Sequence, residues 1–216
     1  MSYPATPWTL RGKAIASLHL VNINQVRSLI PSELQIFSVW PGKTLGCVYL
    51  SNYGEGSVLE YSELIVAPAV VSYQNKIGAW ISHIYVDNVD SVAGGREIWG
   101  LPKELADFTW ENDQRVRVSQ GDRNLCTLNY TQQSLAWRQR LTGSTFSVKG
   151  VELLKFSAEC EARLGLISSQ LEVPTDSPFA SLGLGQAFLT GRFEQMTLTV
   201  AHPEIVGQRV GEVIYR

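Results

Sequence analysis

Residues 95–108 read GREIWGLPKELADF, and this stretch carries the most informative pattern in the chain. Gly94 and Gly95 predict a turn, a bulky apolar cluster follows, and Pro102 restricts the backbone directly before Lys103. A lysine held in apolar surroundings loses the hydration of its ammonium, which favours the neutral amine. The neutral amine is the form that attacks a carbonyl carbon to give a Schiff base. On local chemistry alone, a surface lysine after a turn is the more common arrangement, so both interpretations stay open here.

Short strand-like segments dominate the chain on both sides of this stretch. They are rich in Val, Ile, Tyr and Phe, or they alternate between apolar and polar residues as half-buried strands do. One short helix is predicted at residues 24–30, capped by Asn22 or Asn24 and ended by Pro31. The expected strands cover residues 14–21, 45–51, 63–73, 79–86, 106–110, 115–119, 124–130, 152–156 and 193–200. This spacing predicts a mainly β (α+β) chain, a barrel or sandwich with a few small helices, in a single domain over residues 1–216.

The composition is that of a folded chain with an extensive apolar interior. Of the 216 residues, 44% are hydrophobic and 18% are charged, against roughly 25% charged in an average globular chain. This balance excludes intrinsic disorder and favours a large core, or a surface that is buried in a homo-oligomer. The formal net charge of −2 provides no basic footprint for nucleic acid or for an anionic membrane. We therefore expect a small molecule or another protein as the partner.

Cysteine usage and the first residues indicate a cytoplasmic protein. Cys47, Cys126 and Cys160 are odd in number and widely spaced, which predicts neither a disulfide framework nor a thiolate zinc site. The opening residues, MSYPATPWTLRGK, show no basic start followed by an apolar core, so we expect no signal peptide. The longest strongly apolar run, residues 64–75, is too short to span a bilayer and contains Pro68.

Other common site signatures are not found in the sequence. His19, His83 and His202 have no ligand-like spacing, so we expect no metal site. The chain has no GxSxG elbow, no phosphate-binding GxxxxGK[ST] loop and no GxGxxG fingerprint. The sequence therefore predicts no cofactor.

The stretch at 95–108 resembles the signature of the acetoacetate decarboxylase family, in which a Gly-Arg-Glu segment leads to a Pro-Lys pair that carries the Schiff-base lysine. Lys103 falls on that lysine. Residues 61–63 (YSE) resemble the family's Tyr-x-Glu element, so Glu63 falls on an active-site carboxylate. Residues 86–88 (VDN) resemble the strand end before the Gly-Arg-Glu segment, and residues 27–31 (RSLIP) are similar to the family's first helix and its proline. The resemblance covers residues 10–110.

Three positions depart from the family pattern. Glu104 stands where the family has a second lysine, and Val48 stands near the place of a further pocket carboxylate. Arg11 or Lys13 is an approximate counterpart of the family's early arginine. These departures put acetoacetate in doubt as the substrate more than they affect Schiff-base chemistry.

The resemblance implies a cone-like β-barrel that encloses an apolar pocket, with small helices outside, and a homo-oligomer. It also implies a carbon–carbon lyase for a small keto acid, in which Lys103 forms an imine that serves as an electron sink for decarboxylation or retro-aldol cleavage. Glu63 would then orient the substrate or move protons, and Arg11 would hold a carboxylate. Trp99 and Leu101 would keep the pocket dry. The alternative for Glu63 is a solvated residue at the start of a strand.

The N-terminal half also resembles plant proteins associated with neoxanthin accumulation. The similar segments read PWTLRGKA, SLHLV and TLGCVYLSNY. These plant proteins belong to the same superfamily and lack the reactive lysine. The alternative function is therefore a non-catalytic barrel that binds an apolar ligand such as an isoprenoid or carotenoid.

Two geometric expectations follow for the residues around Lys103. Pairing of the strands at 63–73 and 79–86 should return the chain to the same rim, so that Glu63 and Lys103 approach each other. Successive side chains of an extended stretch point to opposite faces. Lys103 should therefore face the interior while Glu104 faces outward.

Overall fold

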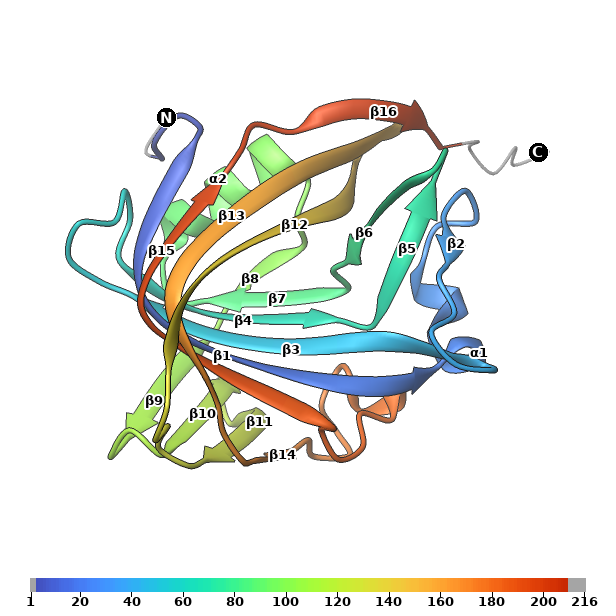
Figure 1. Ribbon diagram of the computed structural model, residues 1–216. Coiled ribbons are helices and arrows are strands. Elements are labelled where there is room, and N and C mark those ends of the chain that lie inside the picture. The colour runs from blue at the N-terminus through green and yellow to red at the C-terminus, as the bar shows by residue number, and fades with distance from the viewer. Residues whose placement is uncertain (1–2, 210–216) are drawn as a thin grey trace.

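The computed structural model describes residues 3–209, and most of these residues belong to two β-sheets (Figure 1). The strands of the large sheet follow one another in space as β2 (Gln35–Ile36), β5 (Ala69–Tyr73), β6 (Lys76–Trp80), β12 (Trp137–Lys149), β13 (Glu152–Leu166), β15 (Leu189–Val200), β1 (Trp8–Asn22), β3 (Lys43–Tyr53), β4 (Tyr61–Ala67), β7 (His83–Val86) and β8 (Lys103–Leu105), with β16 (Glu204–Gln208) paired to β13. The small sheet has the order β14 (Ser169–Glu172), β11 (Arg123–Tyr130), β10 (Arg115–Gln120) and β9 (Asp107–Glu111).

The large sheet curls back on itself between β4 and β6. Pro68 separates β4 from β5, so that β4 pairs with β3 and β7 while β5 pairs with β6. Strand β6 in turn pairs in parallel with β12, one of the long curved strands of Figure 1. The sheet thereby approaches a cone. The mainly β fold expected from the sequence is confirmed, but the sheets do not close into a true barrel.

The two faces of the central strands bury different clusters. On one face, Ile15, Val48 and Leu64 pack with residues of the small sheet such as Val116 and Leu128. On the other, concave face, alternate residues of the same strands form two further clusters around Trp8 and around Tyr53. The period of two in each strand thus divides the interior into a structural core and a second, concave space.

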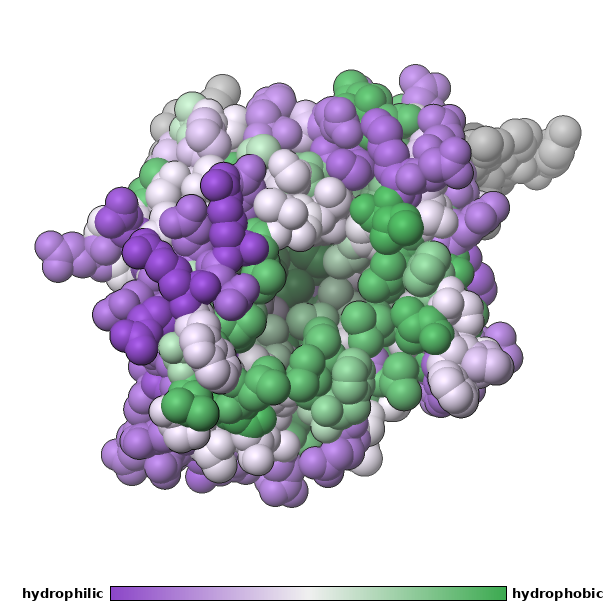
Figure 2. All heavy atoms as spheres, viewed as in Figure 1, coloured by the Kyte–Doolittle hydropathy of each residue, from purple (hydrophilic) through white to green (hydrophobic). Residues whose placement is uncertain are grey.

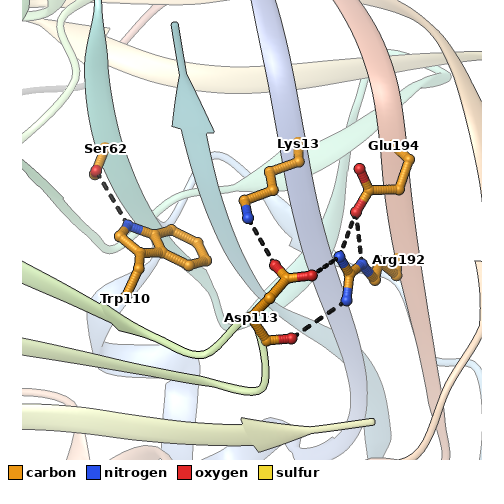
Figure 3. A network of polar contacts seen from close by, with 6 residues as sticks. All are labelled: Lys13, Ser62, Trp110, Asp113, Arg192 and Glu194. Atoms are coloured by element: carbon orange, nitrogen blue, oxygen red, sulfur yellow. Dashed lines mark hydrogen bonds and ion pairs between the residues drawn. The ribbon is translucent and has the colours of Figure 1, made fainter. Parts of the chain in front are cut away.

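Polar contacts clamp the small sheet to the large one (Figure 3). Asp113, in the turn between β9 and β10, accepts a hydrogen bond from Lys13 Nζ at 2.6 Å and another from Arg192. Arg192 Nε also donates to Glu194 Oε1 at 2.6 Å. Although burial opposes it, hydrogen bonding to Lys13 and Arg192 lowers the pKa of Asp113. The clamp fixes β9 and β10 against β1 and β15.

The turn expected at Gly94 and Gly95 is wrong, because both glycines lie inside α2 (Val89–Trp99). Asn88 caps this helix by accepting from the backbone N–H groups of Asp90 and Ser91, and Gly100 ends it in the left-handed conformation at φ 62°. The glycines allow close packing rather than a turn. A Cβ added at Gly95 would lie 2.5 Å from Lys103 Cδ, and one added at Gly94 would lie 2.6 Å from the Trp8 ring.

Other expected elements are confirmed with changed boundaries. The helix expected at 24–30 forms α1 (Ile23–Val26) and one 3₁₀ turn (Arg27–Leu29), and Asn22 caps it. The strand expected at 63–73 divides at Pro68, and the strand expected at 79–86 divides after Trp80. A second 3₁₀ turn spans Ala180–Leu182. Within residues 3–209, no helix has the length and apolar character needed to cross a membrane.

Candidate active site

Lys103 opens β8 and points its side chain into the protein. Strand β8 pairs in parallel with β7, and Lys103 lies opposite Ile84. Its side chain is 4% exposed, whereas the neighbouring Glu104 is exposed and accepts a hydrogen bond from Gln120. Arg96 Nε donates to the Lys103 carbonyl oxygen at 2.8 Å, which ties the strand start to α2. The expected divergence of Lys103 and Glu104 is confirmed.

Two oxygen atoms hold the Lys103 amine. Its Nζ donates to Glu63 Oε1 at 2.8 Å and to Ser91 Oγ at 2.9 Å. Glu63 lies on β4, opposite Ser51 of β3 and Val86 of β7, and its side chain is 6% exposed. The expected approach of Glu63 and Lys103 is therefore observed. The alternative of a solvated Glu63 is wrong.

Aromatic side chains surround the ion pair. Nζ of Lys103 lies 5.0 Å from the centre of the Tyr61 ring and 5.8 Å from that of Trp8, at distances where a ring face attracts a cation. Tyr53 donates to Glu63 Oε2 at 3.4 Å, and the Tyr49 and Tyr53 hydroxyl oxygens lie 3.1 Å apart. The carboxylate and the amine are thus connected to a row of phenolic hydroxyls.

Burial keeps these hydroxyls protonated. Burial raises the pKa of Tyr49, Tyr53 and Tyr61, and the nearby Glu63 carboxylate raises each further. A phenol with a raised pKa stays neutral across the physiological range and donates a hydrogen bond. The three tyrosines therefore act as neutral hydrogen-bond donors beside the ion pair.

Trp99 and Leu101 are buried in the apolar cluster that includes Trp8. The rings of Trp8 and Trp99 meet edge to face at 4.9 Å, and Trp99 Nε1 donates to the Ala201 carbonyl at 2.9 Å. Because Trp8 also faces the Lys103 amine, this cluster forms the apolar side of the site. Trp99 thus contacts Trp8 beside the amine, and Leu101 shares its apolar cluster.

The structure does not bring Arg11 to the ion pair. On β1, Trp8 and Leu10 are buried on the concave side, while Arg11 is exposed. Its possible substitute Lys13 is engaged with Asp113 in the clamp of Figure 3. Val48 packs in the other cluster, on the face of β3 opposite to that of Tyr49.

Four residues of the site were not predicted from the sequence. Ser91 was missed because it lies in α2, where a turn had been expected. Trp8, Tyr49 and Tyr53 lie on strands, and the period of two in residues 49, 51 and 53 was the available signal. The pairing of Tyr53 with Tyr61 and of Ser51 with Glu63 places that row beside the carboxylate.

A hollow adjoins the site on the concave face. Figure 2 shows it in the gap that Figure 1 shows between β12 and β7, with hydrophobic residues around it. Cys47 and Cys160 are only partly buried, yet burial raises their pKa values to about 12 and about 11. Both side chains lie on the concave face that borders the hollow, Cys47 on β3 and Cys160 on β13.

The arrangement contains the groups that amine chemistry uses. A buried amine, a carboxylate in contact with it and neutral hydroxyl donors are the groups that imine formation needs. Among residues 3–209, no group of three His, Cys, Asp or Glu side chains is placed to hold a metal ion.

Sequence comparison relates the chain to two groups of proteins. A family model described as acetoacetate decarboxylase matches residues 1–210. The rice (Oryza sativa subsp. japonica) protein NEOXANTHIN-DEFICIENT 1 is 32% identical over 111 residues, which are 51% of this chain and 36% of the rice protein. The match thus spans little more than a third of that relative's length.

Solved structures share the fold at low identity. The acetoacetate decarboxylase of Legionella pneumophila superposes with a TM-score of 0.82 at 16% identity, covering 98% of this chain and 91% of that chain. The enduracididine biosynthesis enzyme MppR, complexed with pyruvate, superposes with a TM-score of 0.73 at 13% identity, covering 95% and 92%. These likenesses confirm the expected fold.

Proposed function

The chain belongs to the acetoacetate decarboxylase family, and from this premise we propose that it is a Schiff-base-forming carbon–carbon lyase that acts on a keto acid through Lys103. The observation that carries the proposal is the position of the Lys103 amine. It is buried, and it lies 2.8 Å from the Glu63 carboxylate and 2.9 Å from the Ser91 hydroxyl.

Glu63 has a direct role in preparing the amine. An ammonium has no lone pair, so Lys103 must lose a proton before it attacks a carbonyl carbon. Glu63 Oε1 is in hydrogen-bond contact with Nζ and accepts that proton without an intervening group.

The reaction then proceeds through a protonated imine. The amine adds to the ketone carbon, and water leaves as the carbon–oxygen bond breaks. In a β-keto acid, the bond between the α-carbon and the carboxylate breaks, its electron pair moves into the imine to give an enamine, and carbon dioxide leaves. In a β-hydroxy ketone, a base takes the hydroxyl proton, the bond between the α- and β-carbons breaks in the same way, and an aldehyde leaves. A proton returns to the carbon of the enamine, and water hydrolyses the imine to release the ketone product and the free amine. The enzyme MppR, which shares the fold, has been solved in complex with pyruvate, a keto acid, and this supports the substrate class.

Glu104 does not oppose this chemistry. A carboxylate beside the amine would stabilise the ammonium, but Glu104 is exposed on the other side of β8 and hydrogen-bonds Gln120. Water screens an exposed charge strongly. The departure from the family pattern at this position therefore leaves the Lys103–Glu63 pair intact.

Carbon dioxide release from a panel of β-keto and α-keto acids tests the proposal. We expect release from at least one acid, its loss in Lys103→Ala, and its retention in Lys149→Ala, whose side chain lies at the end of β12. Release that persists in Lys103→Ala would refute the role of the lysine.

A second function is favoured by the hollow. An apolar space of this kind also suits a barrel that binds an isoprenoid or carotenoid without chemistry, as the likeness to NEOXANTHIN-DEFICIENT 1 suggests. That function requires no imine at Lys103, so trapping of an imine there separates the two.

A further inference from the structure

The concave face of the large sheet continues the active site over several strands. On β3, the residues of this face are Leu45, Cys47 and Tyr49, followed by Ser51 and Tyr53 beside Glu63. On this face of β3, the polar side chains thus lie at the end beside Glu63, and the apolar side chains lie at the other end. From Ser51 to Leu45 the strand spans six residues, about 20 Å.

Neighbouring strands extend the apolar end. Residues that lie directly opposite each other in paired strands point to the same face of a sheet. Leu20 lies opposite Leu45, and Leu18 lies opposite both Cys47 and Leu189. The face is therefore continuous from β3 through β1 to β15.

Strand β13, which forms another wall of the hollow, also has apolar residues on its inward face and polar residues on its outward face. On β13, residues Ala158, Cys160, Ala162 and Leu164 turn inward, while Ser157, Glu159, Glu161 and Arg163 are exposed. Cys160 lies opposite Leu141 of β12 and Leu198 of β15, and Leu198 lies opposite Leu10, which is buried with Tyr53. The inward face of β13 is thus connected through Leu198 and Leu10 to the active site.

Apolar side chains of this face keep large accessible surfaces at the rim. Leu20, Leu141 and Leu166 are 48%, 42% and 61% exposed. Apolar side chains that stay exposed on one concave face indicate a binding surface. A concave apolar lining with polar groups at one end is the usual form of a site for a small amphiphilic molecule.

We propose that the hollow binds the apolar chain of the substrate, so that the substrate class is a keto acid with a long hydrocarbon chain. The keto acid group lies at Lys103 and Glu63, and the chain lies in the hollow, between the apolar face of β3 and β1 and the apolar inward face of β13 and β12. This inference rests on the proposed Schiff-base function. It departs from a short substrate such as acetoacetate, whose single methyl group would leave the apolar face wet.

Chain length is the variable that tests the proposal. Imines are trapped with borohydride from pyruvate, 2-oxohexanoate and 2-oxodecanoate, and the concentration giving half-maximal adduct on the Lys103 peptide is measured for each. Burial of one methylene contributes ~0.8 kcal/mol, an approximately fourfold gain. We expect the half-maximal concentration to fall on the order of a hundredfold or more from pyruvate to 2-oxodecanoate.

Variants of the hollow locate the chain. Leu141→Gln changes the inward face of β12, and Thr142→Gln changes the outward face of the same strand and is the matched control. Leu141→Gln should reduce the preference for 2-oxodecanoate over pyruvate several-fold, and Thr142→Gln should leave it unchanged. Ala16→Trp, opposite Tyr49, fills the hollow closer to the site and should reduce the preference further. If Ala16→Trp does not fold, the comparison of Leu141→Gln with Thr142→Gln still tests the proposal.

A chain without a keto group separates this inference from the function on which it rests. Binding of 11-(dansylamino)undecanoic acid is followed by its fluorescence in the wild type and in the Leu141 and Thr142 variants. Equal trapping of all three keto acids at Lys103 overturns the long-chain proposal and leaves the Schiff-base function intact. Binding of the fluorescent acid without any trapping supports the hollow as a chain-binding site and contradicts the Schiff-base function. If no keto acid is trapped and the fluorescence does not change, both the long-chain proposal and the Schiff-base function are wrong.

Discussion

Glu63 Oε1 and Lys103 Nζ lie 2.8 Å apart although 40 positions separate the two residues in the chain. Strand β7 brings them together, because it pairs with β4 at Glu63 on one side and with β8 at Lys103 on the other. Both side chains are almost completely buried, so each charge depends on the other for stabilisation. The proposed chemistry therefore depends on this pair.

Replacing the carboxylate should slow imine formation. Glu63→Gln keeps a similar shape but removes the group that accepts the proton from Lys103. Loss of a positioned general base lowers rates by about 10²–10⁴-fold, and we expect that reduction in the rate of borohydride-trapped adduct formation. Glu60→Gln, which changes an exposed residue just before β4, is the control. Equal rates in the two variants would contradict the role of Glu63.

A methyl group at Gly95 should impair the amine without unfolding the helix. The Cβ of Gly95→Ala would lie 2.5 Å from Lys103 Cδ, so the lysine side chain must move. Alanine favours a helix over glycine by about 0.5–1 kcal/mol, which offsets the cost of that movement. We expect the melting temperature to change little while adduct formation falls at least tenfold. Gly143→Ala in β12, where an added Cβ meets nothing within 4 Å, should change neither quantity. Normal adduct formation in Gly95→Ala would show that the amine position is not critical.

The Asp113 clamp should make stability depend on acid pH. The pKa of Asp113 is lowered in the folded protein, because hydrogen bonds from Lys13 and Arg192 outweigh the opposing effect of burial. Its ionised form therefore stabilises the fold above the ordinary aspartate pKa of about 3.9, and this contribution is lost as the pH falls through the folded value. Urea unfolding of Asp113→Asn should show a loss of stability at pH 7 that narrows at the most acid pH tested. Asp122→Asn, at an exposed turn, is the control. A difference from the wild type that is constant with pH would contradict the role of the charge.

The cysteines that line the hollow should resist alkylation. Burial raises the pKa of Cys47 to about 12 and that of Cys160 to about 11, against about 8.5 for a free thiol. At pH 8 the thiolate fraction of each is then on the order of a hundredfold or more below that of a free thiol. Iodoacetamide labelling, followed by mass spectrometry, should be slow in the native protein and rapid in urea. Native labelling of Cys47 at the rate of free cysteine would contradict the enclosed hollow.

Part of this site was predictable because two short segments resemble the family pattern. The resemblance of residues 95–108 and 61–63 identified Lys103 and Glu63, whereas local chemistry alone favoured a surface lysine. The strand alternation placed Glu104 on the opposite side of Lys103, as the structure shows. The mainly β fold followed from strand density together with the family resemblance.

The rest required information that no local pattern contains. Gly94 and Gly95 predicted a turn because glycine disfavours helices, but tertiary packing against Trp8 and Lys103 determines their conformation. That error concealed Ser91. Strand β12 was missed altogether, and its residues 137–143 are exposed on both faces, which removes the alternation that identifies a strand.

Borohydride reduction in the presence of pyruvate, followed by peptide mapping, tests the central claim most directly. Reduction of an imine between pyruvate and an amine leaves a stable secondary amine at the residue that formed it. We predict that the adduct appears on the Lys103 peptide of the wild type and disappears in Lys103→Ala, while Lys13, Lys43, Lys76, Lys149 and Lys155 stay unmodified. An adduct spread evenly over the lysines, or absent from Lys103, would contradict it.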